Sequence, residues 1–305
     1  MTVATYINRG IAGLLPLYAQ EEAKSLMQMV LEHFCGWPSH VYYTDPDRMV
    51  PASSIYDLQR AIDDLTKARP IQYILGETVF EECILKVREG VLIPRPETAE
   101  LVRWAKEGFE VDKPLRILDL CTGSGAIAIA LAKAFPQAKV WGVDLFEEAL
   151  EVAKENSRIN KVAVDFLRVD VLQPPDLSVL PWPPHSFDLI ISNPPYICAS
   201  EKAQMRPNVL DYEPHQALFV PDDDPLLFYR ALAEWGALFL KEHGRLMVEI
   251  NEHKDKEVVA LFEKKRYPSV EVRKDLNGKP RMCCAVTSLS KPQSARPDPY
   301  QYPKR

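Results

Sequence analysis

The chain has 305 residues, of which 47% are hydrophobic and 26% charged, the composition of an ordinary globular protein of about two domains. Its formal net charge of −6 argues against nonspecific binding to nucleic-acid backbones, because proteins that bind them are expected to be basic. The six cysteines form no CxxC pair and no ligand-spaced cluster with the six histidines, so we predict no metal site and free thiols in a reducing compartment.

The amino-terminal residues 1–16 lack the basic start, apolar core and small-residue cleavage site of a signal peptide. No apolar run in the sequence reaches the roughly 20 residues that a membrane span needs. We therefore expect a cytoplasmic protein that binds no membrane, and a monomer.

Residues 1–75 are predicted to form an N-terminal helical bundle. Apolar residues recur at helical spacing over residues 21–34 and again over residues 52–67, and prolines interrupt the chain between them. The bundle has no chemical signature, so it either stabilises the rest of the chain or docks a partner. We assign it to substrate docking, since a bundle appended to an enzyme often selects the substrate.

Residues 76–92 are predicted to be a β-hairpin linker. Two short β-prone stretches, residues 78–80 and 84–87, are bracketed by Gly76 and Gly90. A hairpin at this place would join the helical bundle to the next domain.

Residues 93–287 are predicted to form a single α/β domain. Strands are expected at residues 115–120, 139–144, 164–169, 187–192, 244–250, 270–274 and 282–287, and helices at residues 126–135, 147–159, 225–240 and 255–265. Such alternation indicates a parallel sheet covered on both faces. Asn277–Gly278 is a strong hairpin signal between the last two strands, so one strand should run antiparallel. The Pro-rich, polar residues 288–305 are predicted to be a disordered tail.

The stretch ILDLCTGSGAIAIALA, residues 117–132, leads from a strand into a tight glycine loop that opens a helix. Gly123 and Gly125 allow a ligand to approach the backbone closely, and the helix N-terminus offers unpaired N–H groups. Asp144 closes the next strand about 20 residues further on, the usual spacing for a carboxylate that binds ribose hydroxyls. A glycine loop alone can merely pack a helix on a sheet, but the loop with this acid predicts a nucleotide-containing cofactor.

The spacing of the glycines distinguishes between cofactors. Dinucleotide folds favour G-x-G-x-x-G, whereas D-x-x-x-G-x-G from Asp119 to Gly125 resembles the first motif of S-adenosylmethionine-dependent methyltransferases. The resemblance implies that the cofactor is S-adenosylmethionine, with S-adenosylhomocysteine as the product, and that the loop cups the methionine end of the cofactor. The implied loop contacts are Cys121, Thr122, Gly123, Ser124 and Gly125.

Cys121 stands where that family usually has another glycine. A cysteine is small enough to be tolerated there if its backbone torsions are ordinary, and no histidine is placed by the sequence to activate it as a nucleophile. Asp170 matches the position at which the superfamily usually contacts the adenine, and Val171 is then expected to line the adenine pocket. The alternative for Asp170 is a helix cap or a turn residue.

SNPPYI, residues 192–197, ends an apolar strand with residues that suit a planar –NH2 group. The Asn193 side-chain oxygen can accept one N–H and the Pro194 carbonyl the other, while neither Pro194 nor Pro195 offers a competing N–H. Tyr196 can stack on a flat amide or base. With the cofactor loop upstream, the stretch predicts a catalytic acceptor loop whose Asn193 also borders the cofactor; the alternative is a rigid loop without chemistry.

NPPY is shared by methyltransferases that act on the amino group of adenine in nucleic acid and on the side-chain amide of glutamine. The flanking stretches make the chain resemble the release factor glutamine methyltransferases over nearly its whole length. Those stretches are PIQYILGE (70–77), LIPRPETAELV (92–102), DLCTGSGAIAIALA (119–132), SNPPYI (192–197), VLDYEPHQAL (209–218) and DLNGKPR (275–281). The resemblance implies an N-terminal helical bundle, a β-hairpin linker and a seven-stranded Rossmann-like methyltransferase sheet, mostly parallel with one antiparallel strand.

The resemblance also implies the reaction. A methyl group would pass from S-adenosylmethionine to the amide nitrogen of the glutamine in the GGQ motif of class 1 peptide chain release factors, tuning translation termination. Arg95, Pro96 and Glu97 match a loop that lies near the active site of the family. Glu213 and Pro214 match its Y-E-P segment, and we expect them to shape the peptide groove rather than react.

Three other activities are compatible with parts of the pattern. A sister enzyme that methylates a glutamine of a large-subunit ribosomal protein shares the domain organisation and the NPPY motif. The V-x-D-Y-E-P motif, however, favours the release factor as the substrate. A nucleic-acid adenine amino-methyltransferase should carry a basic target-recognition segment, and this acidic chain shows none, so we expect no direct sequence-specific nucleic-acid binding. The intact glycine loop, Asp144 and NPPY argue against a noncatalytic binding module.

Overall fold

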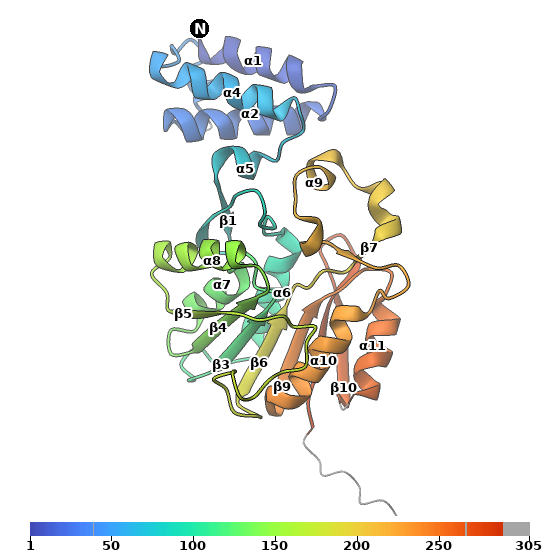
Figure 1. The fold of residues 1–305 in the computed structure, drawn as a ribbon. Helices are drawn as coiled ribbons and strands as arrows, with labels where there is room; N and C mark the ends of the chain where they lie inside the picture. Colours follow the sequence, from blue (N-terminus) through green and yellow to red (C-terminus); the bar gives the residue numbers. More distant parts are fainter. Residues whose placement is uncertain (39, 266, 289–305) are drawn as a thin grey trace, which may run out of the picture.

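The computed structural model describes residues 1–38, 40–265 and 267–288 (Figure 1). Apart from Ser288, the predicted C-terminal tail lies outside the described residues. A small helical bundle stands above a larger α/β unit, and a short hairpin lies between the two (Figure 1). None of the helices in these described ranges is both long and apolar enough to cross a membrane.

The bundle consists of three full helices and shorter pieces. The helices are α1 (Val3–Leu14), α2 (Gln20–Cys35), α3 (Val41–Thr44), η1 (Ala52–Ser54), α4 (Ile55–Leu65) and α5 (Ile71–Leu75). The apolar faces expected from the helical spacing meet in one core, in which Ile7, Met27 and Leu58 are fully buried. The α2 helix ends at Gly36, whose left-handed φ of 66° is a conformation that glycine adopts without strain.

The predicted hairpin is present as β1 (Glu77–Phe80) paired antiparallel with β2 (Cys83–Lys86). Its second strand, β2, is attached to the α/β unit by two asparagine side chains. The Asn156 side chain accepts from Lys86 N–H at 2.6 Å and donates to the carbonyls of Lys86 and Ser124, and Asn160 bonds both backbone groups of Ile84. The Asn156 side chain therefore bridges the hairpin and the glycine loop.

The α/β unit is built on a seven-stranded sheet, as the resemblance predicts. The strands are β3 (Arg116–Leu120), β4 (Lys139–Asp144), β5 (Val164–Arg168), β6 (Phe187–Ser192), β9 (Leu240–Glu249), β10 (Ser269–Lys274) and β11 (Pro280–Val286), in the order β10-β11-β9-β6-β3-β4-β5. All neighbouring pairs are parallel except the two that β11 makes with β9 and β10, so β11 is the one antiparallel strand. The predicted fold class is therefore confirmed.

Helices cover both faces of this sheet, since side chains alternate between the faces along each strand. In β3, Ile117 points into a core shared with α6 (Pro96–Glu107) and α7 (Ala126–Ala134), and Leu118 into the opposite core. That second core is closed by α10 (Leu227–Phe239) and α11 (Asp255–Lys264). The remaining helix, α8 (Glu147–Ile159), packs beside α7 against β4 and β5 (Figure 1).

Two parts of the chain differ from the sequence-based expectation. The helix α6 was not anticipated, and it begins at Pro96, so Pro96 and Glu97 belong to its first turn rather than to a loop. The segment after the acceptor loop carries short elements for which the sequence predicted nothing. They are β7 (Ile197–Cys198), η2 (Ala199–Gln204), α9 (Pro207–Leu210), η3 (His215–Ala217) and β8 (Phe219–Val220), with β7 and β8 paired parallel.

The strand order determines where a ligand can bind. After β3 the chain moves outward through β4 to β5 and then returns to the other side of β3 as β6. Such a reversal opens a crevice at the carboxyl ends of the strands, the usual ligand site of open α/β sheets. The glycine loop follows β3 and the NPPY stretch follows β6, so the two lie on either side of this crevice.

Candidate active site

The glycine loop between β3 and α7 is held in an unusual backbone conformation. Cys121, Gly123 and Gly125 all have left-handed φ values, of 61°, 54° and 80°. A carboxylate on each side fixes the loop. Asp119 accepts a hydrogen bond from the hydroxyl of Thr122 at 2.6 Å, and Asp144 accepts the N–H of Gly123 at 2.8 Å.

The condition of ordinary torsions, under which a cysteine was expected to be tolerated at position 121, is not met. The Cys121 φ of 61° lies in the region that favours glycine, because the β-carbon of an L-residue crowds the following carbonyl there. This explains why a glycine is usual at the position. Burial raises the pKa of the Cys121 thiol well above its usual value, so the group is a neutral thiol rather than a nucleophilic thiolate.

Two small replacements at Cys121 measure this backbone strain. Both Cys121→Ala and Cys121→Gly remove the sulfur, but only glycine removes the β-carbon. We expect Cys121→Gly to be the more stable of the two by about 1 kcal/mol, even though glycine also loses more conformational entropy on folding. Chemical denaturation of both variants checks this value. An alanine variant as stable as the glycine variant would show that the loop carries no strain at this residue.

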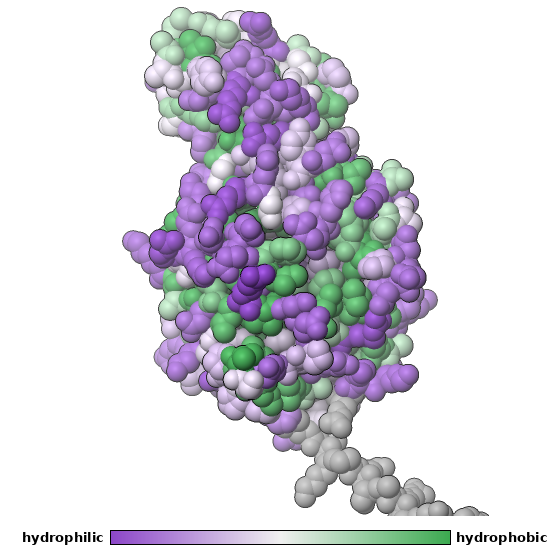
Figure 2. Space-filling view, viewed as in Figure 1, coloured by the Kyte–Doolittle hydropathy of each residue, from purple (hydrophilic) through white to green (hydrophobic). Residues whose placement is uncertain are grey.

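A cavity of about 210 Å³ opens beside the glycine loop. Its walls include Cys121, Gly123, Val91, Leu92, Leu145, Phe146, Asp144, Asp170, Val171, Leu172, Asn193, Pro195, Ala217 and Phe228. Three of its apolar side chains, Leu145, Phe146 and Leu172, are 37–40% exposed, so the cavity offers accessible apolar surface. Figure 2 shows hydrophobic residues gathered below the bundle, on a surface that is otherwise mostly hydrophilic. The cavity therefore suits a ligand with a flat apolar part.

Two carboxylates, Asp144 and Asp170, are among the polar groups of this cavity. Asp144 lines it and accepts hydrogen bonds from the N–H groups of Gly123 and Phe146, at 2.8 and 3.1 Å. Burial raises the pKa of Asp144, and these bonds partly offset the effect. Asp119, beneath the loop, is fully buried, and desolvation raises its pKa to about 7 although Thr122 and Ala128 donate to it. The Asp144 carboxylate is therefore already largely desolvated, so a ligand hydroxyl that donates to it displaces little water.

The predicted cofactor residues divide into two groups. Cys121, Gly123, Asp144, Asp170, Val171 and Asn193 line the cavity. Thr122, Ser124 and Gly125 do not, since Thr122 and Ser124 are buried and Gly125 is the N-cap of α7. Asp170 has the turn role that was its alternative, because it accepts the N–H of Leu172, and it also lines the cavity, so its contact with an adenine stays a prediction.

A second cavity, of about 250 Å³, lies on the other side of the NPPY stretch. Its walls include Asn193, Pro194, Tyr196, Arg95, Met205, Val209, Leu218 and Glu249. Leu92, Asn193 and Ala217 line both cavities. Asn193 therefore lies at the junction between the cavity beside the glycine loop and the cavity beside the NPPY stretch.

Two hydrogen-bond acceptors of the NPPY stretch are free at this junction. Within the described residues, no group donates to the side-chain oxygen Oδ1 of Asn193 or to the carbonyl of Pro194. The next two backbone N–H groups, of Tyr196 and Ile197, both donate to the carbonyl of Leu218 and hold the stretch against β8. A planar –NH2 group could thus be bound by two acceptors without displacing a protein bond.

Sequence reasoning missed two residues that support Asn193. The Asn193 amide nitrogen donates to Thr98 Oγ1 at 2.9 Å, and the Thr98 hydroxyl donates to Glu249 Oε2 at 2.6 Å. The hydroxyl of Tyr196 donates to the other oxygen of Glu249 at 2.8 Å. Glu249 is only 1% exposed and ends the apolar strand LMVE. A carboxylate at the end of a buried strand, next to the candidate site, was the signal available in the sequence.

Arg95 and Glu213, which the resemblance placed near the site, contact each other. The Arg95 guanidinium pairs with Glu213, whose other oxygen accepts the N–H of Ile93. The Glu213 side chain is 1% exposed, so breaking the pair would leave a buried charge without its cation. The pair fastens the stretch before α6 to the segment after α9.

Comparisons with known proteins show which chains this one is similar to. A family model described as a methyltransferase domain matches residues 111–272, and one described as a PrmC N-terminal domain matches residues 13–76. The chain is 39% identical to a release factor glutamine methyltransferase of Flavobacterium psychrophilum and 40% identical to one of Bacteroides thetaiotaomicron. These alignments cover 92% and 93% of the chain and 98% of each relative.

A solved structure is also similar. It is a release-factor-specific protein-(glutamine-N5) methyltransferase of Alicyclobacillus acidocaldarius, 26% identical, and the match covers 64% of this chain and 94% of that one with a TM-score of 0.38.

Proposed function

The chain belongs to the release factor glutamine methyltransferase family, and from this premise we propose that it methylates the glutamine of the GGQ motif in a peptide chain release factor. The donor would be S-adenosylmethionine and the acceptor the side-chain amide nitrogen. The observation that carries the proposal is the position of Asn193 at the junction of the two cavities. Because release factors act on ribosomes, the proposed place of action is the cytoplasm.

The cavity beside the glycine loop fits the proposed cofactor. A β-carbon built on Gly123 would point into open space with no atom within 4 Å, so the backbone there leaves room for a ligand. Asp144 would accept hydrogen bonds from the ribose, while Asp170 and Val171 would lie against the adenine with Phe146 and Leu172. The loop from Cys121 to Gly125 would surround the methionine end. When bound, S-adenosylmethionine supplies an electrophilic methyl group on a sulfonium.

The NPPY stretch would hold the glutamine amide. One amide N–H donates to Asn193 Oδ1 and the other to the Pro194 carbonyl, the two acceptors that no described residue uses. Both acceptors push electron density toward the amide nitrogen, whose lone pair is otherwise delocalised into the carbonyl. They also fix the plane of the amide, so catalysis comes mainly from positioning.

No strong general base is needed before transfer. The nitrogen becomes strongly acidic once it is methylated, and its proton can leave to the same acceptors or to water. Tyr196 is held by its hydrogen bond to Glu249, and burial raises its pKa well above the usual value, so its hydroxyl stays protonated. We assign Tyr196 to contact with the flat amide rather than to proton transfer.

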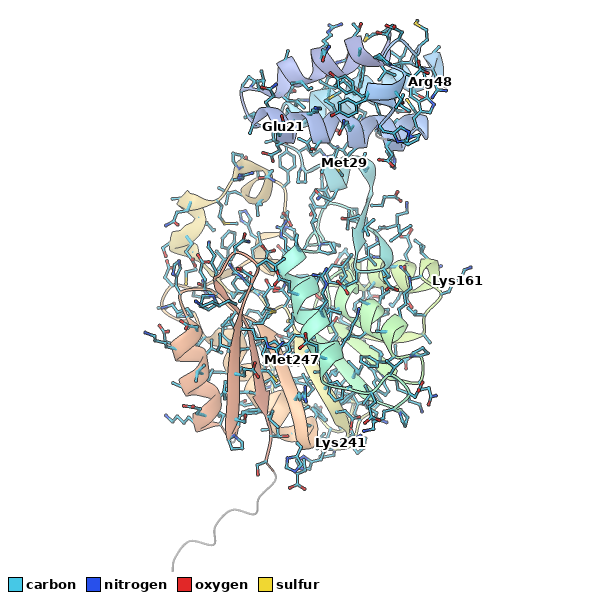
Figure 3. The ribbon with its side chains drawn as sticks, turned by 180° about the vertical axis from the view of Figure 1, so that it is seen from behind. Glu21, Met29, Arg48, Lys161, Lys241 and Met247 are labelled. Atoms are coloured by element: carbon cyan, nitrogen blue, oxygen red, sulfur yellow. The ribbon has the colours of Figure 1, made fainter. Side chains whose placement is uncertain are left out.

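We propose that residues 1–75 form the substrate-docking domain, residues 76–92 the linker and residues 93–287 the catalytic domain. Met29 of α2 is 41% exposed and lies on the side of the bundle that faces the sheet (Figure 3). The segment that walls the second cavity reaches the bundle, because the Tyr212 hydroxyl donates to the carbonyl of Lys67. A protein substrate could contact both units while its glutamine enters the cavity.

Incubation with a purified release factor and methyl-labelled S-adenosylmethionine tests the proposed function. We expect one labelled methyl group on the glutamine of the GGQ peptide, located by mass spectrometry of a digest. Purified large-subunit ribosomal proteins and adenine-containing DNA serve as competing acceptors. Label on one of these, with none on the release factor, would contradict the proposal.

A further inference from the structure

The bonds around Asn193 have a direction that depends on a single proton. The Thr98 hydroxyl carries one hydrogen, and it is donated to Glu249 Oε2 at 2.6 Å. Toward Asn193, at 2.9 Å, the Thr98 oxygen can then only accept. The –NH2 group of Asn193 must therefore face Thr98, and Oδ1 faces the junction of the cavities.

Glu249 determines the direction of this chain of bonds. An ionised carboxylate only accepts hydrogen bonds, and Glu249 accepts one from Thr98 and one from the hydroxyl of Tyr196. Neither donor can reverse while the carboxylate keeps its charge. Glu249 is also buried, where an unsatisfied charged oxygen is especially costly, so both bonds are strongly favoured.

The orientation matters because the two ends of an asparagine amide are nearly the same size. Rotated by half a turn, Asn193 would present its –NH2 group to the –NH2 group of the substrate, and the two donors would repel. Packing alone cannot select one end, whereas a directional hydrogen-bond partner can.

We propose that Thr98 and Glu249 are positioning residues, which orient the Asn193 amide so that Oδ1 receives the substrate. The inference rests on the proposed function, since it assigns how that same site is prepared for an amide. Neither residue needs to touch the reacting atoms.

The charged groups near Glu249 act in opposite directions on its pKa. Burial raises the pKa and is the largest effect, while the hydrogen bonds from Thr98 and Tyr196 and the charge of Arg281 lower it. The charge of Glu97, in the first turn of α6, raises it. The pKa of Glu249 is therefore above its usual value of 4.5, and the carboxylate takes up a proton at a higher pH than an exposed glutamate.

Protonation of Glu249 would reverse the chain of bonds. A protonated Oε2 donates to Thr98, the Thr98 hydrogen turns toward Asn193, and the amide must then present Oδ1 to Thr98. Activity should accordingly fall as the pH falls through the raised pKa of Glu249.

A matched pair of variants at Thr98 tests the positioning role. Thr98→Val keeps the shape but removes the hydroxyl. We expect kcat/KM for release factor methylation to fall about 10- to 100-fold, since the Asn193 amide loses its acceptor and the buried Glu249 carboxylate loses a donor. Thr98→Ser keeps the hydroxyl and should restore most of this loss. The Kd for S-adenosylhomocysteine and the melting temperature are measured for each variant, so that lost folding or cofactor binding is recognised.

The second test follows the pH dependence. Glu249→Gln keeps the volume but cannot change charge, and its amide can bond Thr98 in either direction. We expect its kcat/KM to be lower than that of the wild type. We also expect it to lack the acid limb of the wild-type pH profile, which is the fall in kcat/KM at low pH. Asp119 and Asp144 also titrate in this site, so only the limb that disappears in the variant is assigned to Glu249.

The possible outcomes separate this inference from the proposed function. Wild-type protein that methylates no release factor overturns both. An active wild type together with a Thr98→Val variant of undiminished kcat/KM overturns only the inference, as does a serine variant as impaired as the valine variant. An unchanged acid limb in Glu249→Gln also overturns it.

Discussion

Replacing Asn193 with alanine should lower kcat for methyl transfer about 100- to 1,000-fold, comparable with the loss of an oxyanion-hole donor in other enzymes. The side chain supplies one of the two free acceptors at the junction of the cavities, and alanine offers none. Affinity for S-adenosylhomocysteine should change little, because most of the cavity beside the glycine loop is built by other residues. Single-turnover kinetics and calorimetric titration measure the two quantities separately.

Asn277→Ala is the matched control, since Asn277 is an exposed asparagine between β10 and β11 that lines neither cavity. It should leave kcat unchanged. Normal turnover by the Asn193→Ala variant would refute the acceptor role of Asn193. An equal loss of cofactor affinity and of kcat would instead indicate that the asparagine mainly shapes the cofactor cavity.

Replacing Asp144 with alanine should weaken binding of S-adenosylhomocysteine first, by about 10- to 100-fold. That range corresponds to one or two lost hydrogen bonds to a charged acceptor. Asp144 also holds the N–H groups of Gly123 and Phe146, so part of the loss would come from a looser loop. At saturating cofactor, kcat should fall much less than in Asn193→Ala.

A cofactor analogue separates the two contributions of Asp144. If the carboxylate binds the ribose, a deoxyribose analogue of S-adenosylhomocysteine binds the wild type more weakly than the parent compound. In Asp144→Ala, the analogue and the parent compound should bind with similar affinity, since the carboxylate that would accept from the missing hydroxyl is already gone. An unchanged affinity of Asp144→Ala for the parent compound would refute the ribose assignment.

The sequence predicted those parts of the fold and site that depend on local patterns. Strand–loop–helix order, the glycines and the acid at the end of β4 are all readable along the chain. They predicted a mostly parallel sheet, and the family resemblance implied its seven strands. Parallel strands bring their carboxyl ends to one edge without further information. This is why Asp144, Asp170 and Asn193 were expected together although they are far apart in the sequence.

The sequence could not predict contacts that depend on three-dimensional packing. Thr98 and Glu249 are 151 positions apart, and their hydrogen bond exists only because α6 lies across the end of β9. The left-handed torsion of Cys121 was missed because a cysteine gives no sign of it, as a glycine would have. The short elements between β7 and β8 have too little periodicity to be recognised.

The most direct measurement is a crystal structure of the protein with S-adenosylhomocysteine and a peptide that contains the GGQ motif. We predict that the cofactor occupies the cavity beside the glycine loop and that its sulfur faces the glutamine amide nitrogen. That amide should donate to Asn193 Oδ1 and to the Pro194 carbonyl. A cofactor sulfur remote from Asn193, or a glutamine bound outside the second cavity, would contradict the account.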